Sequence, residues 1–198
     1  YEYVIGPRLG RTSSKEQYAF MYRTDKIEPI SNATYEDPDD IFHREPFMAH
    51  FKIKNGSFDF VLINIHTDPD EATREINSLT LAALKARDLF NDRDIIILGD
   101  LNADCRRGDA YFDEEDFSSP LRASDYIWLI PNEADTNIAE SDCTYDRIII
   151  TRNAWEDFKG EWGVFLFDVL YTLDSEDAKR VSDHYPVWAE FFTDRDTD

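Results

Sequence analysis

The stretch that most restricts the fold of this chain is "DIIILGD", residues 94–100, in which four aliphatic side chains follow one another. In a strand, successive side chains point to opposite faces, so an unbroken apolar run needs an apolar cover on both faces. The run therefore predicts a buried strand inside a layered protein.

Several further segments predict strands, and one predicts a long helix. The predicted strands span residues 18–23, 47–53, 58–66, 126–131, 145–151, 169–173 and 184–192, and residues 1–10 are strand-like as well. Asn-Gly in "KNGS" predicts a hairpin between the second and third of these. Residues 68–90 predict a helix with a capping-type start at Asp68 and Glu71. Its apolar residues recur at helical spacing: Ile76, Leu79, Ala83 and Leu84. Many strands with one long helix favour an α+β sandwich, with sheets packed on each other and helices outside.

Composition narrows the classes of function. The length of 198 residues suits one domain, and 42 acidic against 21 basic residues give a net charge of −21, which argues against a broad basic surface for nucleic acid. Only seven of the bases are lysines, and such a surface stays soluble at high salt, which suggests a salt-tolerant protein. No apolar run approaches the roughly 18 residues of a membrane helix. The two cysteines, Cys105 and Cys143, fit a disulfide or two buried thiols equally well.

Polar side chains of catalytic type gather at the ends of the predicted strands. His66 closes one strand, Asp100 and Asn102 follow the buried one, and two more open with Tyr145–Asp146 and Asp183–His184. Carboxylates and a carboxamide suit a hard cation such as Mg²⁺, and two imidazoles suit proton transfer near neutral pH. A lone histidine at a strand end is usually only packed or solvated. The whole set predicts metal-assisted hydrolysis of a phosphodiester.

Six motifs carry a family resemblance: "GRTSSKEQY", "HREP", "LINIH", "LGDLNADC", "CTYDRIII" and "SDHYPV". With them the chain resembles the deoxyribonuclease I family of the endonuclease/exonuclease/phosphatase superfamily. The resemblance implies an α+β fold, a four-layer αββα sandwich, with a nuclease domain over residues 1–192 and a polar tail or linker over 193–198. It also implies a secreted, divalent-metal-dependent endonuclease that cuts DNA with little sequence specificity.

The resemblance further implies two histidine–carboxylate pairs, His66 with Glu16 and His184 with Asp146. A carboxylate on one ring nitrogen orients the imidazole and leaves the other nitrogen for chemistry. One histidine would activate water and the other would protonate the leaving 3′ oxygen. The residues do not indicate which histidine does which.

Oxygen ligands are implied at three places. Asp100 and Asn102 would hold the phosphate, and Asp100 with Asp183 the catalytic Mg²⁺ or Mn²⁺. Structural Ca²⁺ would bind at two loops, one with Asp40, the Phe42 carbonyl and Glu45, and the other with Asp135, Asn137 and Ser141.

DNA contacts are implied at four positions: Arg11, Arg44, Ser14 and Tyr145. Ser14 stands where the family has a tyrosine against the minor groove. Because a serine cannot stack, the grip on duplex DNA weakens unless Arg106 and Arg107 compensate through phosphate contacts.

The family also bridges the positions of Cys105 and Cys143. Such a disulfide is worth roughly 3–4 kcal/mol in the chain-entropy model and implies export from the cytosol.

One departure from the family lies at the start of the chain. Family members begin with a strand, a helix and a second strand that bears a metal-binding Glu in a "QE" motif, together with an early Asn, and none of these precedes Tyr1. We expect this N-terminal segment on a separate or cleaved chain, or upstream of the residues given; a protein without catalysis is the third reading. The competing functions are a phosphatase or sphingomyelinase of the same superfamily, and a non-catalytic, Ca²⁺-stabilised binding module.

Overall fold

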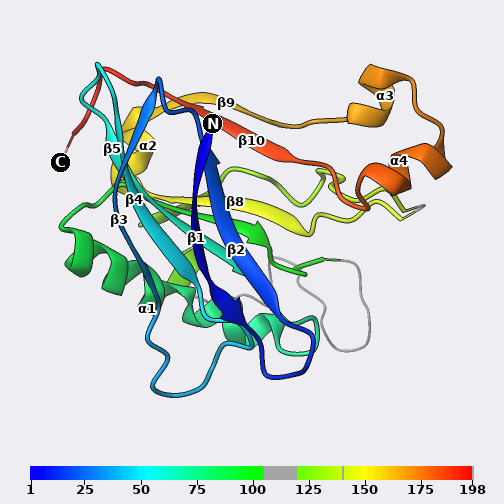
Figure 1. Cartoon of the computed structure of the whole chain (residues 1–198), viewed down its shortest axis with the longest axis horizontal. Coiled ribbons are helices and arrows are strands. Elements are labelled where there is room, and N and C mark those ends of the chain that lie inside the picture. Colours follow the sequence, from blue (N-terminus) through cyan, green and yellow to red (C-terminus); the bar gives the residue numbers. More distant parts are fainter. Residues whose placement is uncertain (105–119, 140, 198) are drawn as a thin grey trace.

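The computed structural model describes residues 1–104, 120–139 and 141–197, and its centre is a six-stranded mixed sheet (Figure 1). The strands lie in the order β3–β4–β5–β6–β8–β7. Their bounds are β3 Ile27–Thr34, β4 Phe47–Ile53, β5 Asp59–His66, β6 Ile95–Asp100, β7 Tyr126–Trp128 and β8 Asp146–Thr151. Only β5 and β6 are parallel among these neighbours. A parallel pair requires a crossover, which the helix α1 (Ala72–Phe90) supplies.

The helix α1 covers one face of this sheet. Ile76 and Leu79 of the helix are buried in one cluster with Ile97 of β6. The alternate residues of β6, Ile96 and Leu98, pack into a cluster on the opposite face. The buried strand predicted from the apolar run is therefore confirmed, because β6 is covered on both faces.

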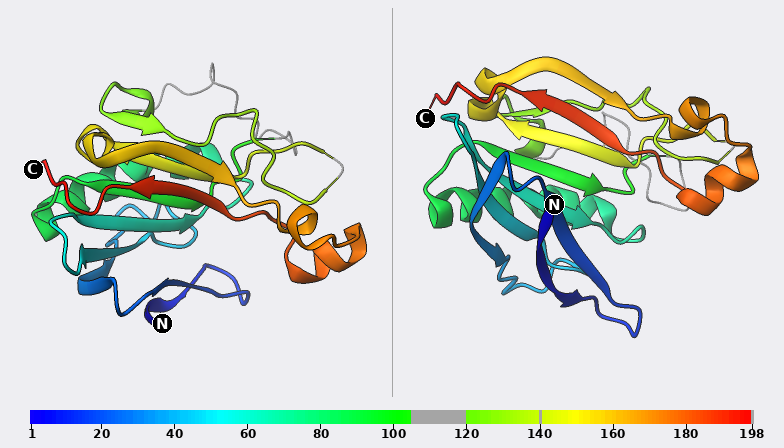
Figure 2. Two further views of the ribbon diagram at one scale, coloured as in Figure 1. Left: turned by 90° about the horizontal axis from the view of Figure 1, so that it is seen from above. Right: turned by 45° about the horizontal axis from the view of Figure 1, so that its top comes forward.

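Two ribbons of two strands each cover the opposite face. One pairs β1 (Glu2–Leu9) with β2 (Glu16–Tyr22), and the other pairs β9 (Phe158–Val164) with β10 (Val187–Phe191). Phe20 of β2 packs on Phe47 of the sheet, and Phe158 of β9 packs in the cluster of Ile96. Figure 2 shows the ribbons as separate strand pairs. Helix, sheet and ribbons make a layered α/β sandwich, and the predicted fold class is confirmed.

The remaining elements are short. They are the 3₁₀ helix η1 (Pro120–Arg122) and the helices α2 (Arg152–Asp157), α3 (Phe167–Tyr171) and α4 (Ser175–Val181). The helices α3 and α4 lie at one end of the molecule, between β9 and β10 along the chain (Figure 1). None of the helices in the described ranges is long and apolar enough to cross a membrane.

The strand predicted at residues 169–173 is wrong, because this stretch is helical. Phe167–Tyr171 forms α3, and Thr172 ends it in a left-handed conformation with its N–H directed to the carbonyl of Asp168. Phe167 is buried against Tyr185 and anchors the turn. Tertiary packing thus outweighs the β propensity of the apolar residues here.

The start of α1 also differs from the prediction. The helix begins at Ala72, and Glu71 is the N-cap residue without a side-chain hydrogen bond to the helix. The Asp68 carboxylate lies 3.3 Å from Nδ1 of His43 instead of capping the helix. In addition, Leu84 is 44% exposed, so it is not part of the core.

Residues 193–197 pack against the sandwich in the structure. The carbonyl of Thr193 accepts a hydrogen bond of 3.0 Å from the N–H of Ser57 in the β4–β5 turn. A Cβ at Gly56 would come within 2.0 Å of the same carbonyl oxygen, so glycine permits this approach. Arg195 lies 4.2 Å from the ring centroid of Phe192. The division into a domain over 1–192 and a tail or linker over 193–198 stays a prediction.

Candidate active site

Three of the predicted catalytic residues stand in one row across the sheet. The strand register pairs His66 at the end of β5 with Asp100 at the end of β6, and Asp100 with Asp146 at the start of β8. Residues directly opposite each other in neighbouring strands point to the same face. A backbone bridge between Asn137 and His184 adds the second imidazole at this end of the sheet.

The "GDLN" turn fixes two of these groups. At Gly99, φ is +141° and a Cβ would lie 1.9 Å from the carbonyl oxygen of Ile65, so only glycine lets β6 approach β5 here. Asn102 has φ +47°, and its backbone N–H donates to Oδ1 of Asp100 at 2.9 Å. Its Nδ2 donates to the carbonyl of Thr67 at 3.0 Å.

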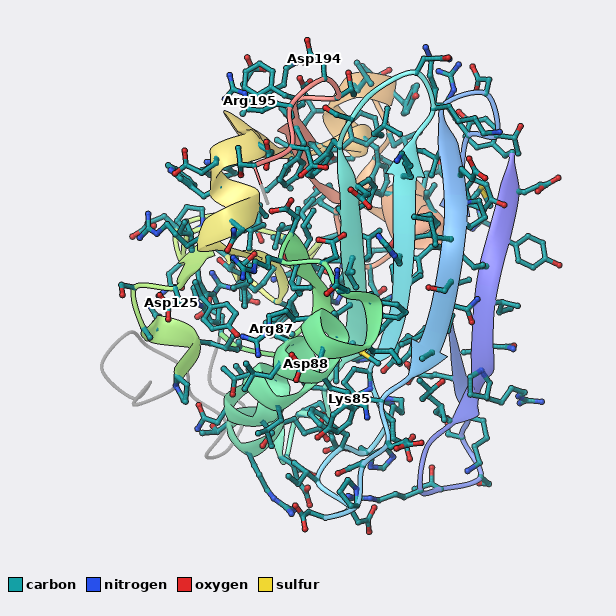
Figure 3. All side chains as sticks on the ribbon, turned by 90° about the vertical axis from the view of Figure 1, so that its left-hand side faces the viewer. Lys85, Arg87, Asp88, Asp125, Asp194 and Arg195 are labelled. Carbon is teal, nitrogen blue, oxygen red and sulfur yellow. The ribbon has the colours of Figure 1, made fainter. Side chains whose placement is uncertain are left out.

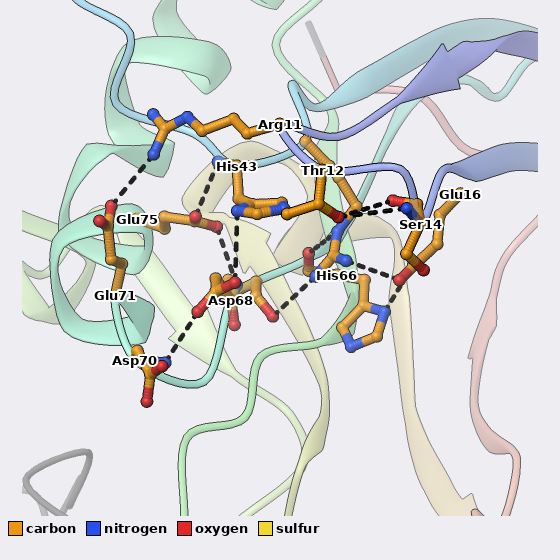
Figure 4. Close-up of polar contacts among 12 residues, drawn as sticks. Arg11, Thr12, Ser14, Glu16, His43, His66, Asp68, Asp70, Glu71 and Glu75 are labelled. Carbon is orange, nitrogen blue, oxygen red and sulfur yellow. Dashed lines mark hydrogen bonds and ion pairs between the residues drawn. The ribbon is translucent and has the colours of Figure 1, made fainter.

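The first histidine is held by a carboxylate and an arginine. Nδ1 of His66 lies 2.7 Å from Oε2 of Glu16, the first residue of β2 (Figure 4). The guanidinium of Arg44 donates to Oε1 of Glu16 at 2.6 Å, to the His66 carbonyl at 3.0 Å and to the Thr67 carbonyl at 3.2 Å. Only 8% of Arg44 is exposed, so its charge is directed into the site. The hydroxyl of Tyr18 accepts a hydrogen bond from the N–H of His66.

The second histidine is held in the same way. Nδ1 of His184 lies 2.7 Å from Oδ2 of Asp146, and the ring stacks on Tyr145 with the centroids 5.6 Å apart. The hydrogen bond with Asp146 raises the pKa of His184 to about 9, although burial opposes the charge. His184 is therefore an imidazolium at neutral pH.

Asp100 lies between the two imidazoles. Its Oδ2 is 3.4 Å from Nε2 of His66. Burial raises the pKa of the Asp100 carboxyl, and the nearby charges of His66 and His184 counteract this shift. The two pairs and Asp100 thus form one electrostatic unit.

Sequence reasoning missed a buried hydroxyl that orients this unit. Oγ1 of Thr136 accepts hydrogen bonds from the N–H groups of Tyr145 at 2.9 Å and Asp146 at 3.1 Å, and the residue is fully buried. A threonine whose hydroxyl bonds only to backbone groups does not stand at a characteristic spacing from other polar residues, so no motif in the sequence reveals it. The same holds for Tyr18 and Thr67.

The remaining predicted DNA-contacting residues lie beside the site. Arg11, in the β1–β2 loop, pairs with the carboxylate of Asp40 at 3.1 Å. It also pairs with the carboxylate of Glu71 at 3.5 Å (Figure 4). Ser14 is exposed in the same loop, and its N–H donates to Oγ1 of Thr12. The expectation of direct DNA contacts at Arg11, Arg44, Ser14 and Tyr145 stays a prediction.

The two predicted calcium loops have different structures. In the first loop, the carboxylate of Asp40, a residue with φ +48°, forms an ion pair with the guanidinium of Arg11. The backbone N–H of Phe42 donates to the carboxylate of Asp37. In the other loop, Oδ1 of Asp135 accepts from the N–H groups of Asn137 and Cys143.

Asn137 of that loop is tied down as well, because its Nδ2 donates to the carbonyl of Ser141. These oxygens are engaged with the protein's own donors. Binding of Ca²⁺ at either loop, including at Glu45, stays a prediction.

The structure describes only one of the two cysteines of the predicted disulfide. Cys143 is fully buried. Cys105 lies outside the described residues, as do Arg106 and Arg107.

Asp100 and Asp183 are the predicted ligands of the catalytic metal ion. Asp183 is exposed, and its backbone carbonyl accepts from the N–H of Ile138, which fixes the strand approach to His184. Mg²⁺ commonly binds through one or two carboxylates and completes its shell with water and substrate phosphate. Two carboxylates suit this chemistry, and the binding of the metal ion by Asp100 and Asp183 stays a prediction.

Comparison with known proteins agrees with the geometry. The family model described as "Endonuclease/Exonuclease/phosphatase family" matches residues 1–184. Deoxyribonuclease-1-like 2 of Mus musculus is 38% identical over 200 residues, covering 98% of this chain and 70% of the relative. Deoxyribonuclease-1 of Bos taurus is 35% identical over 197 residues, covering 94% and 68%. Deoxyribonuclease-1-like 1 of Mus musculus is 36% identical, and the chain spans 60% of its length.

Solved structures share the fold. An endonuclease/exonuclease/phosphatase family protein from Bacteroides thetaiotaomicron superposes with a TM-score of 0.64 at 21% identity, covering 95% of this chain and 73% of that one. The endonuclease domain of TRAS1, a telomere-specific non-LTR retrotransposon, gives 0.62 at 14% identity, covering 98% and 80%. The chain belongs to the endonuclease/exonuclease/phosphatase family, within its deoxyribonuclease I branch.

Proposed function

We propose that the protein is a divalent-metal-dependent endonuclease that hydrolyses phosphodiester bonds of DNA with little sequence specificity. The observation that carries this proposal is the pair of imidazoles, each held at Nδ1 by a carboxylate oxygen at 2.7 Å, on either side of Asp100. In each pair the bond at Nδ1 leaves Nε2 for chemistry on the substrate. The relatives named as deoxyribonucleases support DNA as the substrate.

The charge of His184 supports one assignment of the two proton transfers. Because its pKa is about 9, His184 carries a proton on Nε2 at neutral pH and is the general acid for the leaving 3′ oxygen. His66 then accepts the proton of the attacking water at Nε2. The water oxygen bonds to phosphorus as the bond from phosphorus to the 3′ oxygen breaks, so the products are a 5′-phosphate and a 3′-hydroxyl.

Asn102 and Asp100 position the phosphate in this proposal. Asn102 directs one N–H of its amide to Thr67, and the second N–H is available for a phosphoryl oxygen. Asp100 and Asp183 would hold Mg²⁺ or Mn²⁺, which when bound neutralises charge that builds on the phosphate.

Arg44 takes a positioning role. Its guanidinium donates to Glu16 and to two carbonyls at the end of β5, so it fixes the base His66 through Glu16. The exposed β1–β2 loop with Ser14 would contact the DNA minor groove, with Arg11 at its start. A serine at this position offers hydrogen bonds but no stacking surface, so we expect a lower affinity for duplex DNA than with the tyrosine of the family.

The proposal includes a segment that completes the metal site. An apolar groove of about 520 Å³ lies beside β2, on the face of the sheet that carries the ribbons. Phe20, Phe60, Leu62 and Leu98 line it. We propose that the N-terminal strand–helix–strand of the family, from the same or a cleaved chain, packs here. Export from the cytosol also belongs to the proposal, and the disulfide that the resemblance implies between Cys105 and Cys143 would support it.

Plasmid nicking tests the function. With the N-terminal segment present and Mg²⁺ added, we expect conversion of supercoiled to open-circular DNA and loss of this conversion in EDTA. The substitution His184→Ala should lower the rate by about 10²–10⁴. No nicking would end the nuclease proposal in favour of a binding module. Activity on phosphomonoesters or sphingomyelin alone would favour the other enzymes of the superfamily.

A further inference from the structure

A second group of ligand-type side chains lies at the opposite end of the sheet from the active site. His50 of β4, Asp59 at the start of β5 and Asp92 between α1 and β6 present one nitrogen and two oxygens, all within 4.8 Å of one another. Asp59 and His66 are the first and last residues of β5. At about 3.3 Å per residue this strand separates the two places by roughly 23 Å.

Local structure holds two of the three side chains in place. Asn91 caps the C-terminus of α1 in a left-handed conformation, which turns the chain just before Asp92. Oδ1 of Asp92 accepts from the N–H of Asp94 at 2.7 Å. The ring of His50 packs on Phe90 with the centroids 5.8 Å apart.

The group has more hydrogen-bond acceptors than donors. Nε2 of His50 lies 3.2 Å from Oδ2 of Asp59 and 3.1 Å from Oδ2 of Asp92, and a ring nitrogen carries a single proton. Of these two contacts, the one between Nε2 of His50 and Oδ2 of Asp59 has the geometry of a hydrogen bond. Oδ2 of Asp92 is buried, in a side chain only 4% exposed, and within the described ranges it accepts no hydrogen bond. A buried carboxylate oxygen without a donor is unfavourable unless a cation occupies its lone pairs.

The electrostatic surroundings favour a cation at this point. Asp59 and Asp92 bring two carboxylates to the side chain of His50. The C-terminal end of α1 adds the negative pole of the helix, since its last carbonyls point toward this end. Asp59 is 31% exposed, so the group has an edge open to solvent through which an ion can enter.

We propose that His50, Asp59 and Asp92 bind a structural Zn²⁺ ion. One imidazole with two carboxylates is a ligand set of zinc rather than of Mg²⁺ or Ca²⁺, which prefer oxygen alone. The ion bonds to the lone pair of Nε2 and to one oxygen of each carboxylate, and the Nε2 proton is released to solvent. A water molecule that enters at the solvent-exposed edge beside Asp59 is the fourth ligand. The ion would tie the end of α1 to β4 and β5.

Calorimetric titration of EDTA-treated, dialysed protein with ZnCl₂ tests the site. With about 5 mM Mg²⁺ present to fill the proposed catalytic site, we expect one Zn²⁺ binding event, because Mg²⁺ competes poorly for nitrogen-containing sites. The substitution Asp92→Asn should remove this event or weaken it on the order of tenfold or more. Asp88→Asn is the matched control, because the carboxylate of Asp88 on α1 is 68% exposed, pairs with Arg87 and is not a member of the group (Figure 3).

Thermal unfolding provides a second readout. Zn²⁺ should raise the melting temperature of the wild-type protein and of Asp88→Asn, but not of Asp92→Asn. If Asp92→Asn does not fold, Asp59→Asn replaces it, because Asp59 is partly exposed and its loss is better tolerated. Absence of the event in the wild-type protein would overturn the proposal. So would unchanged affinity and stoichiometry in both variants, since the group would then be a protonated histidine between two aspartates.

Discussion

The charge of a single residue, His184, gives the proposed mechanism a measurable pH dependence. Its raised pKa depends first on the hydrogen bond with Asp146. Because the general acid must be protonated, we expect the kcat/KM of the active protein to fall as the pH rises through about 9. Asp146→Asn keeps the shape and an acceptor for Nδ1 but removes the negative charge. The alkaline limb of the profile should then shift down by about 2 pH units, toward the ordinary histidine pKa.

The same pair contributes to stability with a definite sign. The folded state holds the His184 proton more tightly than the unfolded state, so its contribution is complete below the ordinary pKa of 6.5 and is lost as the pH rises through about 9. The difference in unfolding free energy between wild type and Asp146→Asn should follow this course. Asp177→Asn, which removes an exposed carboxylate of α4, is the control for both measurements. An unmoved alkaline limb in Asp146→Asn would exclude His184 as the acid.

At this scale the sequence predicts the candidate catalytic residues better than the residues that support them. His66, Asp100, Asp146 and His184 meet as expected because strand register places strand ends together. The side chain of Arg44 shows what the sequence leaves out. Its DNA contact stays a prediction, and its burial and its hydrogen bond to Glu16 come from folding, which brings "HREP" next to the start of β2. Such a contact depends on tertiary structure and has no local pattern.

At the scale of elements, Glu75 couples α1 to the loop before β4. Its carboxylate is fully buried and accepts from the N–H groups of His43 at 2.8 Å and Asp68 at 3.3 Å. The helical periodicity that predicted Ile76 and Leu79 as core residues does not reveal a buried acid beside them. The true start of α1 follows from this arrangement, since Glu75 rather than a capping box organises the preceding loop.

Burial raises the pKa of Glu75 to about 7 from an ordinary 4.5, which predicts how stability depends on pH. Between these values the folded protein holds a proton that the unfolded chain has lost. The unfolding free energy should therefore decrease as the pH rises from about 4.5 to about 7, by on the order of 3 kcal/mol at most. Glu75→Gln is neutral throughout and should remove this slope in urea denaturation, although it lowers stability overall because Gln has only one acceptor oxygen.

Glu71→Gln is the control for this measurement. Glu71 precedes the same helix but is 40% exposed and pairs with Arg11 and Arg74, so its loss should leave the slope between these pH values in place. A slope in Glu75→Gln equal to that of the wild type would contradict the assignment.

Among the strands, predictability follows composition and place in the sheet. The strand β4 has the predicted bounds, and β5 starts one residue later than expected, because apolar residues make up most of both strands. The sequence does not reveal β3, an edge strand with Pro29 and a break in register beside it. The same is true of β9, "FKGEWGV", whose Lys, Glu and Gly residues are poor strand formers. Both strands exist because a neighbour supplies the hydrogen bonds.

For the whole molecule, the excess of acidic residues is the property that remains to be explained. A net charge of −21 makes the folded chain repel itself and repel DNA. The layers and the site could be predicted from strand patterns and motifs, whereas the consequence of this charge depends on its sum over the surface. It concerns solubility, stability and the approach of substrate rather than the fold.

Salt should therefore act on this protein in the direction opposite to that for a basic nuclease. The Debye length falls from about 10 Å at 0.1 M salt to about 3 Å at 1 M, so repulsion among the carboxylates is screened. We expect the melting temperature to rise over this range of NaCl, and plasmid nicking to persist and first to increase, because DNA approaches a screened surface more easily. Sucrose at equal osmolality is the control for general exclusion effects, since it leaves charge unscreened. Loss of all nicking at moderate NaCl would show that phosphate contacts by a few arginines outweigh the repulsion of the whole surface, and would contradict a salt-tolerant enzyme.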